Sequence, residues 1–288
     1  MYGYVGVVEK LLNVISRDEL RSSLDQWKQR KISDGVLCDI YEGIKWKDNA
    51  NFFNGPGVNL GLSLFVDWFN PFSRSAGEIG LIVIVILNLP RQIRFKIENL
   101  IVAGVIPGPK EPALNINSFL KPIVNDLKEL EKGILDPCDR KTQIRGKLLQ
   151  VIADMPARCK TIGSMSFNAT QGCHRCSLRN DEWGVKGKTF EIVKQTSDAL
   201  KKNDNSWRIV ANQYKVDKTV STREALARST GIRYSYLLEL DGYSPCSSPV
   251  IEPMHLLWQN ACQDIFKSFI SKGVLSPTVM YQMCLRLQ

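Results

Sequence analysis

The sequence predicts an α/β protein in which a mixed sheet is flanked by helices. Two observations support this fold class. Three apolar, extended segments at 58–65, 78–89 and 100–106 follow one another and predict three strands. An amphipathic segment that begins at Asn117 and a further extended segment at 148–153 then predict a helix and a fourth strand.

The boundaries of these elements follow from residue types. Pro107, Gly108 and Pro109 stop the third strand, because proline cannot donate to a ladder and glycine favours turns. The predicted helix places five apolar residues on one face and ends at Gly133. Those five residues are Leu120, Ile123, Val124, Leu127 and Leu130.

The rest of the chain is assigned from weaker patterns. Residues 1–57 are predicted to form a helical lead-in followed by a loop at 49–57, and 58–171 the first part of the core. Residues 172–230 are interpreted as an insertion that carries a cysteine pair. Residues 231–288 are predicted to supply the last strand, at 233–240, and a last helix, at 253–271. Six residues of that helix are expected to face the core: Met254, Leu257, Trp258, Ala261, Ile265 and Phe269.

Composition excludes some classes of protein. The longest apolar run, 79–89, has roughly half of the about 20 residues that a membrane-spanning helix needs. No signal peptide is visible, so an intracellular protein is expected. The net charge of +9 suits a polyanionic partner, although many soluble proteins are equally basic.

Two aspartates lie at strand ends in this pattern. Asp67 follows the first predicted strand, and Asp154 follows the fourth. Two-metal phosphodiester chemistry needs carboxylates that converge from neighbouring elements, and Mg²⁺ or Mn²⁺ prefers oxygen ligands. From strand order alone, a pair of metal ligands and a pair of strand-terminal turn residues are equally consistent with the sequence.

Six short motifs occur in a fixed order along the chain. They are Val66-Asp67-Trp68-Phe69-Asn70-Pro71-Phe72, Asn88-Leu89-Pro90-Arg91, the segment from Gly104 to Pro112, Asp154-Met155-Pro156-Ala157, Gly172-Cys173-His174-Arg175-Cys176 and Glu252-Pro253-Met254-His255. Together they resemble the transposases of the CACTA (En/Spm) superfamily, especially the branch found in fungi and invertebrates.

The resemblance implies a ribonuclease-H-like fold and a DDE/D-type transposase. Such an enzyme cleaves and joins DNA at transposon ends, so double-stranded DNA in the nucleus is the expected partner. Asp67 and Asp154 correspond to the first two catalytic acids, with Mg²⁺ or Mn²⁺ as cofactor. Glu252 stands where the family commonly has Asp, and Asp264 is the alternative third acid. Whether the chain forms a homo-oligomer is left open.

A structural zinc site is a further expectation. Cys173 and Cys176 have the spacing of a zinc knuckle, although a complete site needs four ligands. His255 is the candidate that would complete it from the last helix, with Cys262 and His174 as further candidates. Two reduced, partly buried thiols are the alternative.

Four basic residues are candidate DNA contacts. Lys110 lies in the Pro/Gly loop after the third strand, and Arg91, Arg94 and Lys96 lie between the second and third strands. Such residues could bind phosphates, and an ordinary turn or solvated hairpin would look the same.

Two rival functions share most of these features. A transposase-derived chain that no longer catalyses, and that survives as a relic or a nucleic-acid-binding protein, would keep the motifs but depart from them near the third acid. The departures are Glu252 in place of Asp, and Gln263 where a basic residue is expected. A ribonuclease H acting on RNA–DNA hybrids would share the fold and metals but would not explain the Pro/Gly loop or the cysteine pair.

Overall fold

The computed structural model describes residues 3–31, 35–71, 77–177 and 201–274, together with 179, 276 and 278. The chain forms two compact units, Met1–Val250 and Ile251–Gln288. Each unit is considered by itself.

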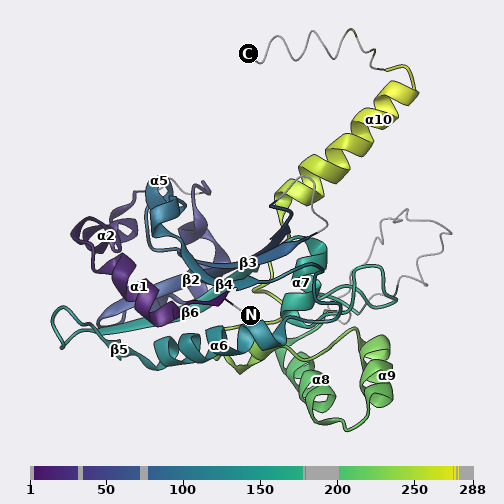
Figure 1. The fold of residues 1–288 in the computed structure, drawn as a ribbon. Coiled ribbons are helices and arrows are strands. Elements are labelled where there is room, and N and C mark those ends of the chain that lie inside the picture. Colours follow the sequence, from purple (N-terminus) through teal and green to yellow (C-terminus); the bar gives the residue numbers. More distant parts are fainter. Residues whose placement is uncertain are drawn as a thin grey trace. The chain divides into compact units, whose positions relative to one another are not determined.

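The first unit is built on a six-stranded mixed sheet with the order β1-β4-β3-β2-β6-β5 (Figure 1). β2, β3 and β4 pair in antiparallel fashion, and β6 runs parallel to β2 on its other side. The predicted series of three strands, a helix and a fourth strand is therefore confirmed. The strands are β1 (Gly3–Tyr4), β2 (Val58–Phe69), β3 (Ile79–Ile86), β4 (Ile101–Ile106), β5 (Ile134–Leu135) and β6 (Gln143–Ile152).

Helices flank this sheet, and one of them, α6 (Asn117–Lys132), follows β4 and leads through the short strand β5 to β6. All five apolar residues that were predicted to face the core from α6 are buried, and Gly133 ends the helix with a φ of 102°. The other helices of this unit are α1 (Val7–Ile15), α2 (Asp18–Ser23), α3 (Ile44–Asp48), α4 (Ala50–Phe53), α5 (Arg91–Arg94), α7 (Met155–Ile162), α8 (Asp204–Val216) and α9 (Val220–Thr230). Short 3-10 turns span Gln26–Gln29, Ile40–Glu42, Ile97–Asn99 and Tyr236–Glu239.

The two faces of the sheet carry different cores. On one face, alternate residues of β2, from Leu60 to Val66, belong to the main apolar cluster together with residues of α1, α6 and α7. Figure 1 shows α6 lying along that face. The opposite side of β2 meets a smaller aromatic cluster that includes Trp46 and Phe53, whose rings stack at 3.8 Å. That stack explains why 50–53 is helical, where the polar sequence predicted a loop.

The fifth strand predicted at 233–240 is not formed. Tyr236–Glu239 is a 3-10 turn instead, because the Asn117 side chain binds the carbonyl of Tyr234 and the N–H of Tyr236. These are backbone groups that a strand would have used for its ladder. The edge beside β6 is met by Pro249, which forms an isolated parallel bridge with Val151.

The segment interpreted as an insertion contains a helix that reaches the main core. Its helix α8 contributes Trp207 and Ala211, both fully buried, to the main core. Two apolar residues one turn apart were too weak a pattern to predict this burial. Residues 180–200 lie outside the described residues.

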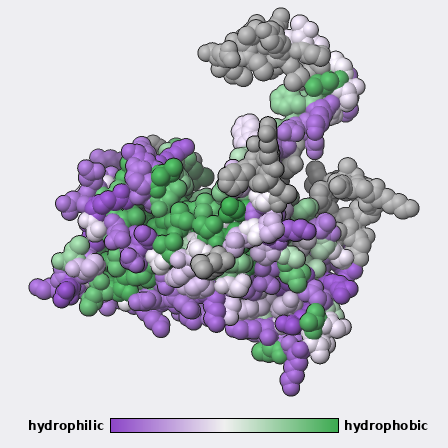
Figure 2. Space-filling model, in the orientation of Figure 1, coloured by the Kyte–Doolittle hydropathy of each residue, from purple (hydrophilic) through white to green (hydrophobic). Residues whose placement is uncertain are grey.

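The second unit contains a π-helix, Met254–Cys262, which continues into α10 (Gln263–Ser271). The predicted helix is present, but its apolar residues were expected to be buried, and Trp258 and Ile265 are 69% and 52% exposed. Periodicity identifies an apolar helix face without identifying a partner for it. Figure 2 shows green apolar residues at the surface of this helix beside purple hydrophilic ones.

Among the described residues, no helix combines the length and the apolar character needed to cross a membrane.

Candidate functional site

Asp67 and Asp154 lie at the same end of two neighbouring parallel strands. In the register of β2 and β6, Phe65 is opposite Ile152, and each aspartate follows two residues later. Neighbouring strands are about 4.8 Å apart, so carboxylates at matched positions on one face lie close to each other. The register therefore places the two predicted acids at the same end of neighbouring parallel strands.

A β-bulge in β6 sets this match. Leu62 is opposite Leu148, whereas Ser63 is opposite Gln150, so Leu149 is the additional residue. A shift of one residue sends every later side chain to the other face of a sheet. With the bulge, Val66 and Ala153 both belong to the main core, and the aspartates that follow them alternate away from it.

Local hydrogen bonds hold both carboxylates. Asp154 begins α7, and its Oδ1 accepts the N–H of Ala157 at 2.7 Å, as is typical of an N-cap residue. Pro156 in the first turn favours this helix start. Asp67 is exposed near the end of β2, where its Oδ1 accepts the N–H of Trp68 at 2.9 Å.

The Pro/Gly loop lies beside these strand ends. Gly108 approaches Glu78 so closely that a Cβ atom would lie 2.4 Å from the Glu78 carbonyl oxygen. Glu111 forms an ion pair with Lys160 of α7, whose Nζ lies 5.5 Å from the ring centre of Trp68. The loop is thus tied both to the helix that Asp154 begins and to the neighbour of Asp67. Lys110, within the loop, is exposed.

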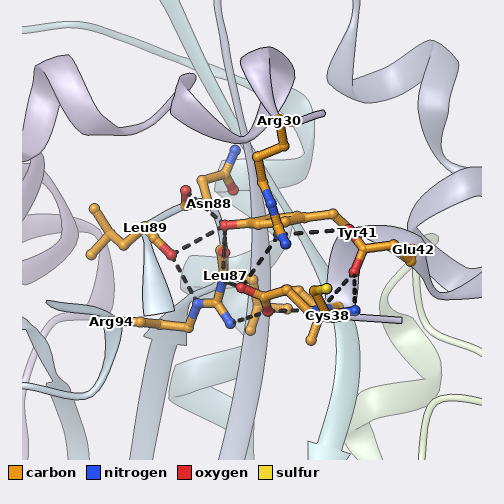
Figure 3. A network of polar contacts seen from close by, with 10 residues as sticks. Arg30, Cys38, Tyr41, Glu42, Leu87, Asn88, Leu89 and Arg94 are labelled. Atoms are coloured by element: carbon orange, nitrogen blue, oxygen red, sulfur yellow. Dashed lines mark hydrogen bonds and ion pairs between the residues drawn. The ribbon is translucent and has the colours of Figure 1, made fainter. Parts of the chain in front are cut away.

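The three basic residues between β3 and β4 do not share one role. Arg91 and Lys96 are exposed, as a phosphate contact requires, but Arg94 is only 2% exposed. Arg94 donates to both carboxylate oxygens of Asp39, at 2.7 and 3.0 Å, and to the hydroxyl of Tyr41 (Figure 3). Arg94 therefore ties α5 to the Ile40–Glu42 turn and is not on the surface that was predicted for it.

The contacts of this buried network shift the pKa values of Asp39 and Tyr41. Burial alone would raise the pKa of Asp39, but the hydrogen bonds and charge of Arg94 outweigh it and hold that pKa below its usual value. Burial raises the pKa of Tyr41. The Tyr41 hydroxyl lies against the carbonyls of Leu87, Asn88 and Leu89, so the network fixes the chain that leaves β3 (Figure 3).

The cysteine pair lies in a basic environment. The Sγ of Cys173 accepts the N–H of Arg175 at 3.4 Å, and Lys202 donates to the Cys173 carbonyl. Cys176 pairs with Lys201 in an isolated antiparallel bridge. His174 is buried, at 4% exposed, whereas Cys173 is exposed. Burial, together with Arg158 and Arg175, lowers the pKa of His174 to about 3.

The remaining predicted residues lie in the second unit. Glu252 accepts the N–H groups of Met254 and His255, at 2.8 and 2.7 Å, and its Oε2 lies 2.6 Å from Nδ1 of His255. Partial burial raises the pKa of Glu252, but these hydrogen bonds outweigh it and the pKa is lowered. Asp264 is an exposed acid on α10, with Lys267 at 4.0 Å.

Across the part of the chain that the structure describes, no three His, Cys, Asp or Glu side chains gather closely enough to hold a metal ion. The aspartate pair supplies two oxygen-donor residues, which suits a hard divalent cation but is less than a full carboxylate set.

Comparison with known proteins identifies the family. A family model for the transposase family tnp2 matches residues 34–226, which is more than half of the chain. The chain belongs to this transposase family. The match includes Asp67, Asp154, the Pro/Gly loop and the cysteine pair, and it ends before Glu252. No curated protein matches the chain.

Proposed function

We propose that this chain is the catalytic part of a DNA transposase of the CACTA type, which cleaves and joins DNA at transposon ends. The observation that carries this proposal is the matched placement of Asp67 and Asp154 on parallel strands within a transposase family match. Membership of a transposase family suggests DNA as the partner, and the nucleus is the compartment where such DNA would be met.

The strand arrangement supports the ribonuclease-H-like fold that the resemblance implies. Three antiparallel strands, a connecting helix and a parallel strand that leads to the second acid occur in the expected order. The parallel bridge at Pro249 gives the outer side of β6 a further strand-like neighbour, although the predicted segment 233–240 does not supply it.

Asp67 and Asp154 would hold Mg²⁺ or Mn²⁺, with Glu252 as the third acid and Asp264 as its alternative. Bound divalent ions supply activation of the attacking water or hydroxyl and stabilise the leaving oxygen. The residues contribute position: the β6 bulge matches the two aspartates, and the α7 cap fixes one oxygen of Asp154. Exposed Arg91, Lys96 and Lys110 would contact DNA phosphates.

We further propose a structural Zn²⁺ on Cys173 and Cys176. The N–H that Arg175 donates to the Cys173 sulfur supports a thiolate there. His255 remains the proposed additional ligand from the sequence.

The second candidate is a transposase-derived DNA-binding protein without catalytic activity. The observation that favours it is the local use of Glu252, because both of its carboxylate oxygens accept bonds from its own helix turn. A carboxylate engaged in this way is less available to a metal.

A nicking assay with DNA that carries the transposon terminal repeats tests the first candidate. We expect Asp67→Asn and Asp154→Asn each to abolish Mn²⁺-dependent nicking, while Glu9→Gln, at an exposed acid of α1, leaves nicking unchanged. Calorimetric Mn²⁺ titration is the second measurement. Binding that is lost in both aspartate variants supports the catalytic candidate. DNA binding without Mn²⁺ binding or nicking supports the relic.

A further inference from the structure

A pocket with no assigned role lies beside the buried Arg94 network. It has a volume of about 380 Å³ and opens between the Gln26–Gln29 turn and the start of α5. Its lining includes Trp27, Arg30, Asp39, Pro90, Arg91 and Gln92. This volume falls within the range of roughly 300–1,000 Å³ that small-molecule sites usually have.

One wall of this pocket is rigid. Asp39 is fixed by two bonds from Arg94, and Trp27 is held in the aromatic cluster, with its ring centre 5.7 Å from that of Tyr41. Arg30 lies over the Tyr41 ring at 5.1 Å and within 3.6 Å of both Asp39 and Glu42. A wall held in this way is organised before a ligand arrives, which reduces the entropy lost on binding.

The opposite wall carries polar groups that the fold does not use. Arg91 and Gln92 are exposed on α5, and no described residue forms a hydrogen bond or ion pair with either side chain. On the rigid wall, Trp27 has a buried indole N–H with no hydrogen-bond partner among the described residues. The lining contains two arginines, Arg30 and Arg91, and one acid, Asp39. Its net charge is therefore positive, which favours an anionic ligand.

These groups match the parts of one nucleotide. Pro90 and Trp27 provide flat apolar contacts for a base, and a glutamine amide can both donate to and accept from a base edge. Arg91 provides the charge that a phosphate requires. A purely apolar ligand would leave Arg91 and Gln92 without partners.

We propose that this pocket binds an unpaired nucleobase of DNA, with Gln92 on the base edge and Arg91 on the adjoining phosphate. This inference rests on the proposed function, because the base belongs to DNA that the transposase holds during cleavage. The base is in the pocket while its duplex lies across the neighbouring surface that carries the exposed Lys96.

Fluorescence anisotropy with two matched DNAs tests this proposal on the full chain. Both are short duplexes with one protruding nucleotide, which is intact in the first and abasic in the second. We expect the intact DNA to bind about fivefold more tightly or better, the minimum for one well-made base contact. Gln92→Ala should abolish that preference and leave affinity for the abasic DNA unchanged.

Charge-matched variants separate the pocket from general DNA affinity. Arg91→Ala and Lys96→Ala each remove one exposed positive charge, but only Arg91 lines the pocket. Arg91→Ala should weaken the binding of both DNAs, and of the intact DNA more strongly, because the docked base holds the adjoining phosphate beside Arg91. Lys96→Ala should weaken the binding of both DNAs equally. Trp27→Phe keeps the ring packing and removes the N–H, and we expect a partial loss of the preference.

The outcomes distinguish this inference from the proposed function. Equal affinity of the wild-type chain for the two DNAs, with nicking intact, overturns the pocket and leaves the transposase assignment standing. A preference that survives Gln92→Ala also overturns it. Failure to bind either DNA overturns both. Competition by a free nucleoside monophosphate at the same pocket, with no difference between the two DNAs, would identify a small-molecule site and reject the proposed ligand.

Discussion

At the scale of single residues, neighbouring basic residues have separate roles. The sequence does not distinguish the three basic residues Arg91, Arg94 and Lys96 from one another. In the structure, Arg94 of α5 is buried against Asp39, whereas the other two are exposed. The sequence could not predict this, because the partner of Arg94 lies 55 positions earlier in the chain. The strands that carry Asp67 and lead to Asp154 could be predicted from their apolar sequence, although β2 continues past Asp67 to Phe69.

We predict that Arg94→Met lowers the free energy of unfolding by about 3–5 kcal/mol, because it leaves the buried carboxylate of Asp39 without its cation. Urea denaturation at neutral pH measures this change. Arg91→Met is the matched control, since an exposed substitution usually costs less than about 0.5 kcal/mol. Equal effects of the two variants would show that the buried pair is not an important source of stability.

Glu239 gives a pH-dependent prediction at the same scale. A hydrogen bond from Tyr234 and contacts with Lys215 and Lys128 lower its pKa from 4.5 to about 2. A lowered carboxyl pKa stabilises the fold above the unfolded value, and this stability is lost as the pH falls through the folded value. We expect Glu239→Gln to cost about 1–2 kcal/mol at neutral pH after allowance for solvent screening.

Denaturation at a series of pH values checks this prediction. The difference between the wild type and Glu239→Gln should shrink as the pH falls from 4.5 towards about 2. If the difference in the free energy of unfolding stays constant over this range, the substitution destabilises the fold for a steric reason and not through the lost charge.

At the scale of elements, local sequence patterns predicted most of the helices and strands. Contacts between residues far apart in the sequence determined how those segments pair. The strands, α6 and its apolar face follow from periodicity and terminators. The bulge at Leu149 does not, because a bulge exists only relative to the partner strand. The failed strand at 233–240 has the same origin, since the side chain of Asn117 on another element takes its backbone groups.

The Pro/Gly loop offers an element-scale prediction. In Gly108→Ala the new methyl group would meet the carbonyl of Glu78 at 2.4 Å, so the loop must move away from β3. We expect the melting temperature to fall by several degrees, as for a loss of about 1–2 kcal/mol, and nicking to decrease because Lys110 moves with the loop. Gly77→Ala, at a glycine where a Cβ would meet no described residue within 4 Å, should be neutral in both assays. A neutral Gly108→Ala would contradict the close approach.

At the scale of the whole chain, the positive charge is divided between structural and exposed residues. The net charge of +9 suggested a polyanionic partner but could not show which cations face solvent. Arg94 and Arg158 are buried, whereas Arg91, Lys96 and Lys110 are exposed. Glu252, the proposed third acid, belongs to the second compact unit, and its assignment rests on motif order alone.

Salt dependence of DNA binding measures how many of those exposed cations contact phosphates. Each contact releases counterions and adds about 0.9 to the slope of log K against log salt concentration. We expect Arg91→Ala, Lys96→Ala and Lys110→Ala each to reduce the slope for duplex DNA by about this amount, whatever the base sequence. Lys10→Ala, at an exposed lysine of α1, should leave the slope unchanged. If all four variants reduce it equally, DNA is attracted by net charge alone, and the surface next to α5 and the Pro/Gly loop is not its binding site.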